Sequence, residues 1–210
     1  VEIDTSSNSK SISVIMPLKH KSSFSVSELP EDIKSSMAAF ILANVIKDKR
    51  DMTKNHRSML INVSRFTNVQ EQVSDLVNEY LKEVQDSCRL YCQLDENIAL
   101  KDNNIRKLKE VYENIYSNIP YKWSDIQNLI YSSCAGIKVQ TINQKNGKNL
   151  NYDEYKDGLR LIAVGGMSLS RGLTLEGLTI SYFYRNSKMY DTLMQMGRWF
   201  GYRNGYDDLC

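Results

Sequence analysis

The end of the sequence is rich in the two residue types that most readily surround a phosphate group. The stretch "GGMSLSRGLTLEGLTISYFYRNSKMYDTLMQMGRWFGYRNGYDDLC", Gly165 to Cys210, holds most of the ten glycines of the chain and four arginines between Arg171 and Arg203. Glycine allows backbone N–H groups to approach a ligand closely, and the planar guanidinium of arginine matches phosphate oxygens. This composition predicts a phosphate-binding region.

The first half of this region, "VGGMSLSRGLTLEG", follows a run that has the composition of a buried strand and ends at Val164. It offers backbone N–H groups, hydroxyl groups and one guanidinium, which are the groups that contact a phosphate or a nucleic-acid backbone. The candidates are Ser168, Ser170, Arg171, Gly172 and Thr174. The alternative is a glycine-rich crossover loop that only turns the chain.

The second half contains "YDTLMQMGRWFGYR", which predicts a helix from Tyr190 with Gln195 and Arg198 near its end and Arg203 shortly after it. An arginine at a helix end beside a sheet edge can complete an ATP site from across a cleft, as an arginine finger does in phosphoryl transfer. The alternative is that the two arginines form structural ion pairs. The acids available for such pairs are Glu176, Asp191 and Asp207.

Other motifs of phosphoryl transfer are missing from the sequence. It contains no G-x-x-x-x-G-K-[ST] loop, and no acidic pair at a strand end is a convincing magnesium site. We therefore expect that this chain does not hydrolyse ATP alone. A two-metal nuclease needs clustered carboxylates, and the nearest local pattern is "DEYK", Asp153 to Lys156. A metal-dependent endonuclease and a non-catalytic docking module remain the alternatives.

Composition places the chain among ordinary globular proteins. Its 210 residues are 41% hydrophobic, and its net charge of +2 means that any nucleic-acid contact must come from a local basic surface. The longest apolar run, Met37 to Ile46, is about half the length of a membrane-spanning helix. No secretion signal is present, so we expect a cytoplasmic protein with reduced cysteines and no membrane partner. A start at Val1 and an end at Cys210 suggest a piece of a longer protein.

The cysteines and histidines predict no site of their own. Cys88 and Cys92 are four residues apart and share a helix face, but no second Cys or His pair stands at ligand spacing, so we predict no metal site. His20 and His56, the two histidines, have no nucleophile pattern beside them. We expect both to be ordinary surface or packing residues.

The elements that would position the phosphate-binding region alternate between strands and helices. Buried-strand runs are predicted at Ser58–Ser64, Ile137–Ile142, Leu159–Gly165 and Leu178–Tyr184. A helix is predicted from Pro30 to Arg50, with acids in its first turn and bases in its last, and another after a cap at Thr67 or Asn68. The run from Ser11 to Leu18 favours a short strand or an extended segment. The fold class is α/β with a mostly parallel, doubly wound sheet, in which ligands bind at the carboxyl ends of the strands.

The stretch 86–133 has a different character from the strands and helices around it. It is rich in Asn, Lys, Glu and Tyr, and its patterns are helical, so we predict an all-helical insertion. Its tyrosines include Tyr91, Tyr112 and Tyr116. Tyrosines can stack on bases, but at helical spacing they favour core or partner contacts.

Three segments together resemble a known family. They are "HRSMLINVSRFTNVQ", "GLRLIAVGGMSLSRGLTLEGL" and "SKMYDTLMQMGRWFGYRNGYDDLC". All resemble the bacterial Z1 (Z-one) domain family, often labelled an endonuclease, and the last two also resemble the fifth and sixth motifs of superfamily-two helicases. The resemblance implies a RecA-like domain at 58–85 and 134–210, an extended segment and leading helix at 1–57, and the helical insertion at 86–133.

The resemblance also implies roles for individual residues. Nucleotide-binding residues would be Gly172, Thr174, Glu176, Gln195 and Gly197, nucleic-acid contacts would be Ser168, Ser170 and Arg171, and Arg198 and Arg203 would be catalytic arginines. Arg203 lies five residues after Arg198, where helicases commonly have three, so Arg198 is the better finger candidate. ATP and Mg²⁺ would bind with an upstream RecA-like domain of the same protein. The association of the family with bacterial defence and repair favours DNA over RNA.

Overall fold

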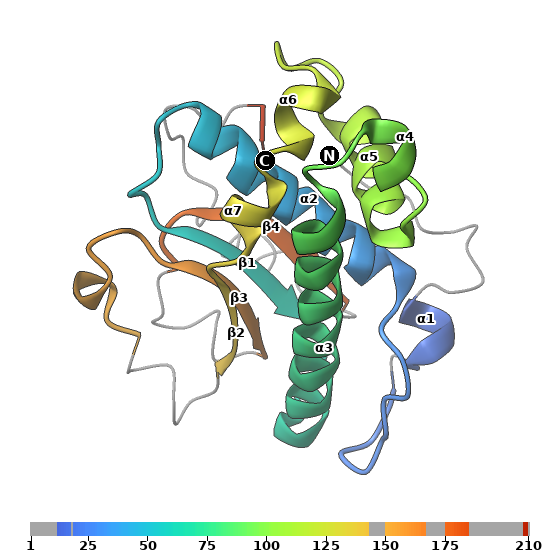
Figure 1. Cartoon of the computed structure of the whole chain (residues 1–210). Helices are drawn as coiled ribbons and strands as arrows, with labels where there is room; N and C mark the ends of the chain where they lie inside the picture. The colour runs from blue at the N-terminus through green and yellow to red at the C-terminus, as the bar shows by residue number, and fades with distance from the viewer. Residues whose placement is uncertain (1–11, 18, 143–149, 167–174, 185–207, 210) are drawn as a thin grey trace.

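The computed structural model describes residues 12–17, 19–142, 150–166, 175–184 and 208–209 (Figure 1). At its centre is a parallel four-stranded sheet in the order β2-β3-β1-β4. The strands are β1 (Arg57–Asn62), β2 (Ile137–Ile142), β3 (Arg160–Gly165) and β4 (Leu178–Phe183). The predicted α/β class with a parallel sheet is confirmed, and the architecture is consistent with a RecA-like fold.

The two central strands, β1 and β3, are buried on both faces because both faces of the sheet are covered, whereas the outer strands β2 and β4 are partly exposed. In β1, Met59 and Ile61 belong to the larger core, whereas Leu60 between them belongs to a smaller core on the other face. The short 3-10 helix η2 (Tyr152–Glu154) and its neighbours contribute to that smaller core. A strand buried on both faces reads as a continuous apolar run, which is the pattern that the sequence shows.

Two long helices cover one face of the sheet. Helix α2 (Glu31–Lys49) packs on β4 and β1, and helix α3 (Thr67–Tyr91) packs on β2 and β3 (Figure 1). The predicted helix after Pro30 is confirmed, with acids in its first turn and Lys47 and Lys49 in its last. Most of α2 is buried, whereas α3 buries one stripe and exposes the opposite face.

The residues between α3 and β2 are helical in most of their length. They form α4 (Glu96–Ala99), α5 (Asn103–Ile115), α6 (Trp123–Gln127) and α7 (Ile130–Cys134). These helices pack on α2 and α3 and share the larger core with them. Helix α3 itself continues past residue 86, where the insertion was predicted to begin. Tyr112 and Tyr116 are buried, so the interpretation of these tyrosines as core residues is confirmed.

Two local predictions are wrong. The run from Ser11 to Leu18 is not a strand, because residues Ile12–Ile15 form the helix α1. Its backbone N–H at Ile12 donates to the Asp32 carboxylate, and Ile12 and Met16 are both buried, one helical turn apart. Tertiary contacts thus override the β-branched composition.

The predicted cap of α3 is also wrong. Thr67 is already helical and Phe66 holds the cap position, and neither it nor any other described side chain caps the helix. Asn68 instead donates its side-chain N–H to the carbonyl of Ser22. In the described ranges, no helix combines the length and the apolar character that a bilayer span requires.

Candidate functional site at the carboxyl edge of the sheet

The predicted phosphate-binding loop begins at the carboxyl edge of the sheet. Strand β3 ends at Gly165, and the buried Gly166 follows it. Strand β4 ends at the same edge, where the backbone N–H of Tyr184 donates to the carbonyl of Asn62 at the end of β1 (3.0 Å). Outside the described residues lie Ser168, Ser170, Arg171, Gly172, Thr174, Gln195, Gly197, Arg198 and Arg203.

At the turn between β1 and α3, Ser64 meets His20, which precedes it by 44 residues in the sequence. The Ser64 hydroxyl lies 2.8 Å from Nε2 of His20, and Nδ1 of His20 lies 2.8 Å from the carbonyl oxygen of Pro17. Because a carbonyl can only accept, Nδ1 carries the proton and Nε2 accepts from the serine. Ser64 Oγ also accepts from the backbone N–H of Phe66 (3.1 Å).

This pair serves as a tether and not as a nucleophile with its base. Ser64 is buried and its hydroxyl is engaged both as donor and as acceptor. The His20 ring packs against Phe24 and Phe66 at centroid distances of 5.7 and 5.8 Å. His20 therefore fastens the segment before α2 to the edge of the sheet, in agreement with its expected role as a packing residue.

Gln70 joins the turn after β1 to the end of β3. Its Nε2 donates to the carbonyl of Ser64 (2.9 Å), while its Oε1 is buried and has no partner among the described residues. A Cβ on Gly166 would lie 2.4 Å from Nε2 of Gln70 and 3.0 Å from the Ser64 carbonyl oxygen. A side chain at position 166 would therefore displace the Gln70 amide from its present place. The start of the predicted phosphate loop is thus packed directly on the first turn of α3.

The N-terminus of α3 has the electrostatic character of an anion site. The helix is 25 residues long and begins immediately after the carboxyl end of β1. Its first N–H groups carry the positive end of the helix dipole, and no described side chain caps them. The exposed Arg65 guanidinium lies 4.7 Å from the ring centroid of Phe66 at the same turn. A helix N-terminus at the carboxyl edge of a parallel sheet is a common position for phosphate.

Two tyrosines, Tyr182 and Tyr184, lie at the end of β4, at the carboxyl edge of the sheet. Burial raises the pKa of Tyr182, and a hydrogen bond with the Asp32 side chain raises it further. Burial likewise raises the pKa of Tyr184, whose hydroxyl donates to the carbonyl of Met16 (2.8 Å). Both phenols stay protonated at neutral pH and act as hydrogen-bond donors. They join the end of β4 to α1 and α2.

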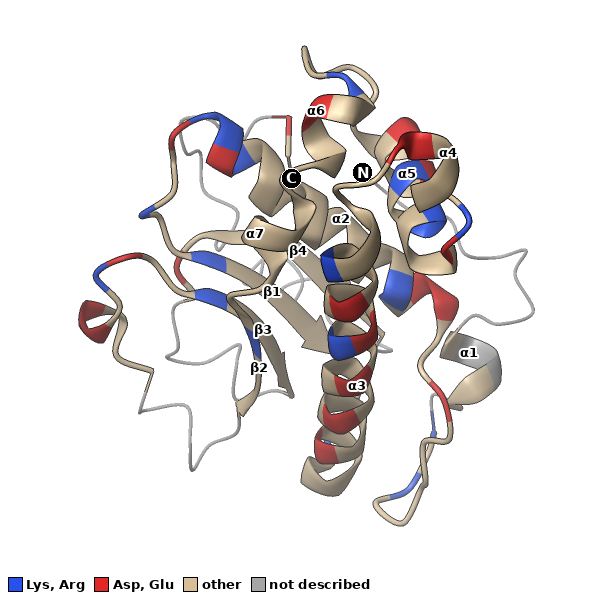
Figure 2. Cartoon of the chain, viewed as in Figure 1, with Lys and Arg blue, Asp and Glu red and all other residues tan. Residues whose placement is uncertain are grey.

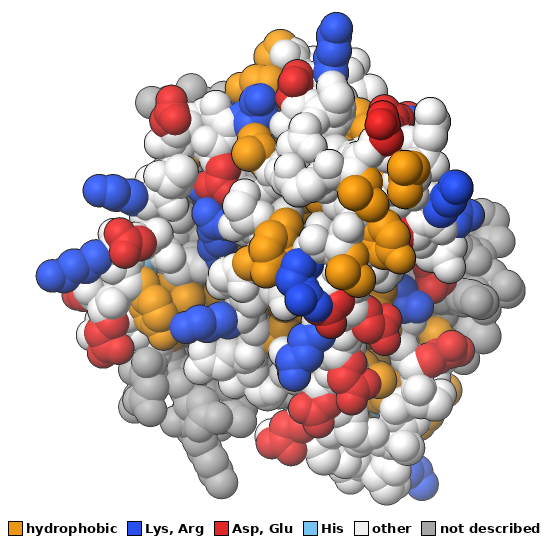
Figure 3. All heavy atoms as spheres, in the orientation of Figure 1, with side chains coloured by type: hydrophobic (Ala, Val, Ile, Leu, Met, Phe, Trp, Pro, Cys, Tyr) orange, Lys and Arg blue, Asp and Glu red, His pale blue; other side chains and the backbone are white. Residues whose placement is uncertain are grey.

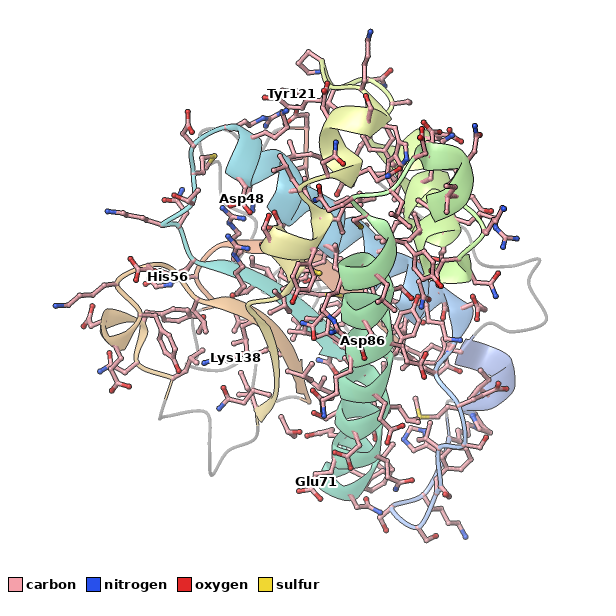
Figure 4. The ribbon with its side chains drawn as sticks, viewed as in Figure 1. Asp48, His56, Glu71, Asp86, Tyr121 and Lys138 are labelled. Carbon is pink, nitrogen blue, oxygen red and sulfur yellow. The ribbon has the colours of Figure 1, made fainter. Side chains whose placement is uncertain are left out.

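At the amino edge of the sheet, where the parallel strands begin, several polar side chains bind one carboxylate. Asp48, at the C-terminal end of α2, accepts from Arg57 Nη2 (2.6 Å) and from Arg160 Nη2 (3.0 Å), and also from the Ser133 hydroxyl (Figure 4). Arg57 is fully buried, and it also donates to the backbone carbonyl of Asn44. Burial lowers the pKa of Arg160, although its interaction with Asp48 opposes that shift.

Glu176, one of the predicted nucleotide-binding residues, lies at this amino edge. Its Oε2 is 4.0 Å from Nε2 of His56, and its backbone N–H donates to the Tyr152 hydroxyl. Nδ1 of His56 accepts from the backbone N–H of Leu159, and its ring packs edge-on against Tyr152. Glu176 is thus placed at the start of β4, across the sheet from Gly166. His56 is a packing residue, as expected.

Within the described part of the chain, neither the cysteines nor the carboxylates near Asp153 form a metal site. The buried thiols of Cys88 and Cys92 meet that of Cys134, and hydrogen bonding with these two thiols, together with burial, raises the pKa of Cys88. No group of three acidic, cysteine or histidine side chains in the described ranges could hold a metal ion. Asp153 lies on η2 beside the amino edge, and its backbone N–H donates to the side chain of Asn151.

Sequence comparison identifies the family. The model of the Z1 domain matches residues 32–210, which covers both long helices, the whole sheet and the predicted phosphate-binding region. No curated protein and no solved structure matches the chain significantly. Because this match covers most of the chain, the chain belongs to the Z1 domain family.

Proposed function

We propose that this chain is the second RecA-like domain of a helicase-like ATPase that acts on DNA. The observation that carries the proposal is the carboxyl edge of the sheet. There, β3 ends at Gly165, and Gly166 after it packs on the first turn of α3, whose N–H groups no described side chain caps. The glycine- and arginine-rich loop of the sequence continues from Gly166, which lies beside the positive end of α3.

Within this proposal, the loop after β3 divides its residues between two ligands. Ser168, Ser170 and Arg171 contact the nucleic-acid backbone, while Gly172 and Thr174 face the nucleotide. Gln195 and Gly197 complete the nucleotide side, and Arg198 is the arginine finger, with Arg203 as a second candidate. The phosphate-binding loop and the Mg²⁺ ligands come from an upstream RecA-like domain, since this sequence contains neither.

The test of the arginine finger is Arg198→Ala in the full-length protein. A finger stabilises charge in the transition state, so we expect ATP turnover to fall by about 10³- to 10⁵-fold. Nucleotide affinity and melting temperature should change little, because ground-state binding and folding do not depend on a finger. Arg203→Ala in the same assay shows whether the second arginine contributes. Retained turnover in Arg198→Ala, or a loss that matches the loss of folded protein, would reject the role.

The nucleic-acid contact is tested separately with Arg171→Ala. Each phosphate contact releases counterions, so DNA affinity should fall as salt increases, and the variant should show a shallower dependence by roughly one unit of slope. Lys156→Ala, at the amino edge, is the matched loss of one positive charge and should leave the slope unchanged. An equal effect of the two variants would contradict a contact at this loop.

The endonuclease alternative receives no support from the described geometry. Asp153 and Glu154 are exposed on η2 at the edge opposite the end of β3, and no carboxylate cluster surrounds them in the described residues. Incubation of the full-length protein with DNA and Mg²⁺ or Mn²⁺ tests the alternative directly. Metal-dependent cutting that is lost in Asp153→Ala would favour it over the proposal.

A further inference from the structure

The described surface exposes four large hydrophobic side chains near the C-terminal end of α3. They are Leu90, Leu94, Ile98 and Tyr131, which are 58%, 41%, 47% and 38% exposed, and we call them the apolar patch. Figure 3 shows orange side chains gathered over this end of α3 and the neighbouring α4 and α7. Exposed apolar groups of this size usually mark a surface that another molecule covers.

The apolar patch stands on a rigid base. Cys88 and Cys92, on the same turns of the chain as Leu90, are fully buried in the core, so the leucine faces away from it. The Gln127 side chain donates to the backbone carbonyls of Cys92 and Leu94, and it accepts from the Trp123 ring N–H. Gln93 donates to the carbonyl of Asn128. These bonds fix the chain under the patch, so a partner meets a surface that is already formed.

The exposed face of α3 beside the patch is acidic. Figure 2 shows mostly acidic positions along it, interrupted by Lys82 and Arg89. We call the acids the acidic stripe; its members are Glu71, Asp75, Glu79, Glu83 and Asp86. The base closest to the patch in sequence, Arg89, is paired with Asp86 at 3.0 Å. This charge disfavours the phosphate backbone of a nucleic acid and favours a cationic partner.

We propose that the apolar patch and the acidic stripe together bind a cationic amphipathic helix of a partner protein. Apolar side chains of that helix, three or four residues apart, would cover Leu90, Leu94 and Ile98, and its Lys and Arg residues would face Glu79 and Glu83. A second copy of this chain fits less well, because a symmetric contact brings two acidic surfaces together. The site is distinct from the carboxyl edge, since α3 separates its own two ends by about 35 Å.

The test uses a synthetic probe and the 210-residue chain. The probe is a fluorescent peptide of about 18 residues in which Leu and Lys alternate with helical period, and the control is a peptide of the same composition without that period. Fluorescence anisotropy gives both affinities at several salt concentrations. We expect the amphipathic peptide to bind at least about 10-fold more tightly than the control and to weaken as salt increases.

Variants locate the binding surface. Leu90→Ser combined with Leu94→Ser should reduce the affinity at least about 10-fold without lowering the melting temperature, because both side chains are exposed. Glu79→Gln combined with Glu83→Gln should weaken binding and flatten its salt dependence. The matched control is Asp153→Asn with Glu154→Gln, which removes the same charge at the amino edge and should have no effect.

Three results would overturn the proposal. They are equal binding of the two peptides, unchanged affinity of the leucine variant, and sedimentation of the chain as a dimer that the leucine variant dissociates. The last result would assign the patch to a second copy. None of them bears on ATP turnover or DNA binding at the carboxyl edge, so this proposal and the proposed function fail independently.

Discussion

The two edges of the parallel sheet use their polar groups in different ways. At the amino edge, Asp48 accepts hydrogen bonds from two arginines and a serine, and backbone carbonyls also hold the fully buried Arg57, whose Nε alone lacks a partner among the described residues. At the carboxyl edge, the N-terminus of α3 lacks a side-chain cap among the described residues, and the buried Oε1 of Gln70 lacks a partner there. The difference lies in the ionic network: the amino edge pairs its buried charge with a carboxylate, whereas the carboxyl edge presents a helix N-terminus that no described side chain caps.

The largest effect should follow from breaking the amino edge. Asp48→Ala leaves the buried Arg57 and the half-buried Arg160 without their carboxylate, which should lower the free energy of unfolding by about 3–5 kcal/mol. The control is Asp86→Ala, whose partner Arg89 is exposed, with an expected change of roughly 0.5 kcal/mol or less. Urea denaturation of both variants measures the difference. Similar losses in the two would show that the amino edge is not a stability centre.

A second test concerns the glycine before β4. Gly177 has φ +67°, and a Cβ there would lie 1.7 Å from the carbonyl oxygen of His56. Gly177→Ala should therefore cost roughly 2–4 kcal/mol of stability, because both the backbone conformation and the contact are incompatible with a side chain. A methyl group on Gly136 would meet nothing within 4 Å, so Gly136→Ala is the matched control and should be tolerated. A small thermal shift for Gly177→Ala would contradict the contact.

A third and smaller effect is expected at the carboxyl edge. Gln70→Met removes one hydrogen bond to Ser64 but also removes the unpaired Oε1, so stability should change by about 1 kcal/mol or less. Because Gln70 packs on Gly166, we expect DNA-stimulated ATP turnover of the full-length Gln70→Met variant to fall. This fall should be larger than the small loss of folded protein would explain. Gln85→Met is the control, since Gln85 bonds the carbonyl of Cys134 on the helical side of the molecule. Equal turnover of the two variants would remove Gln70 from the proposed site.

The smallest effect concerns acid. Hydrogen bonding from Arg50 lowers the pKa of Asp208, which means that the pair stabilises the fold fully above the ordinary Asp pKa. This contribution is lost as pH falls through the lowered value. The difference in urea midpoint between the wild type and Asp208→Asn should therefore shrink between about pH 6 and about pH 3. A difference that stays constant across this range would show that the ion pair does not contribute.

Local patterns predicted most of the fold. The four strands and the two long helices follow from apolar periodicity and from charges at the ends of α2, which act over a few residues. The α1 segment and the cap of α3 were predicted wrongly because contacts with Asp32 and Ser22, 20 and 46 residues away, decide them. Sequence patterns carry no information about such pairs until the order of the strands is known.

The same limit applies to the site. The sequence predicted that the glycine-rich loop starts at the carboxyl edge, and the structure confirms this for Gly165 and Gly166. It did not reveal Gln70 or the contact between His20 and Ser64, since both depend on how the turn after β1 meets other segments. Arg57, directly before the apolar run of β1, was a signal for the amino edge, because a charge that a strand carries into the core requires a partner.

The strand order also dictates when the sheet can assemble. The central β1 lies between β3 and β4, and its flanking contacts join residues 103 and 118 positions apart. During synthesis, β1 therefore leaves the ribosome without either neighbour and waits while α3 to α7 form from local contacts. Its unpaired edges stay available to other chains for that interval, so the nascent protein is most prone to aggregation before β4 is made.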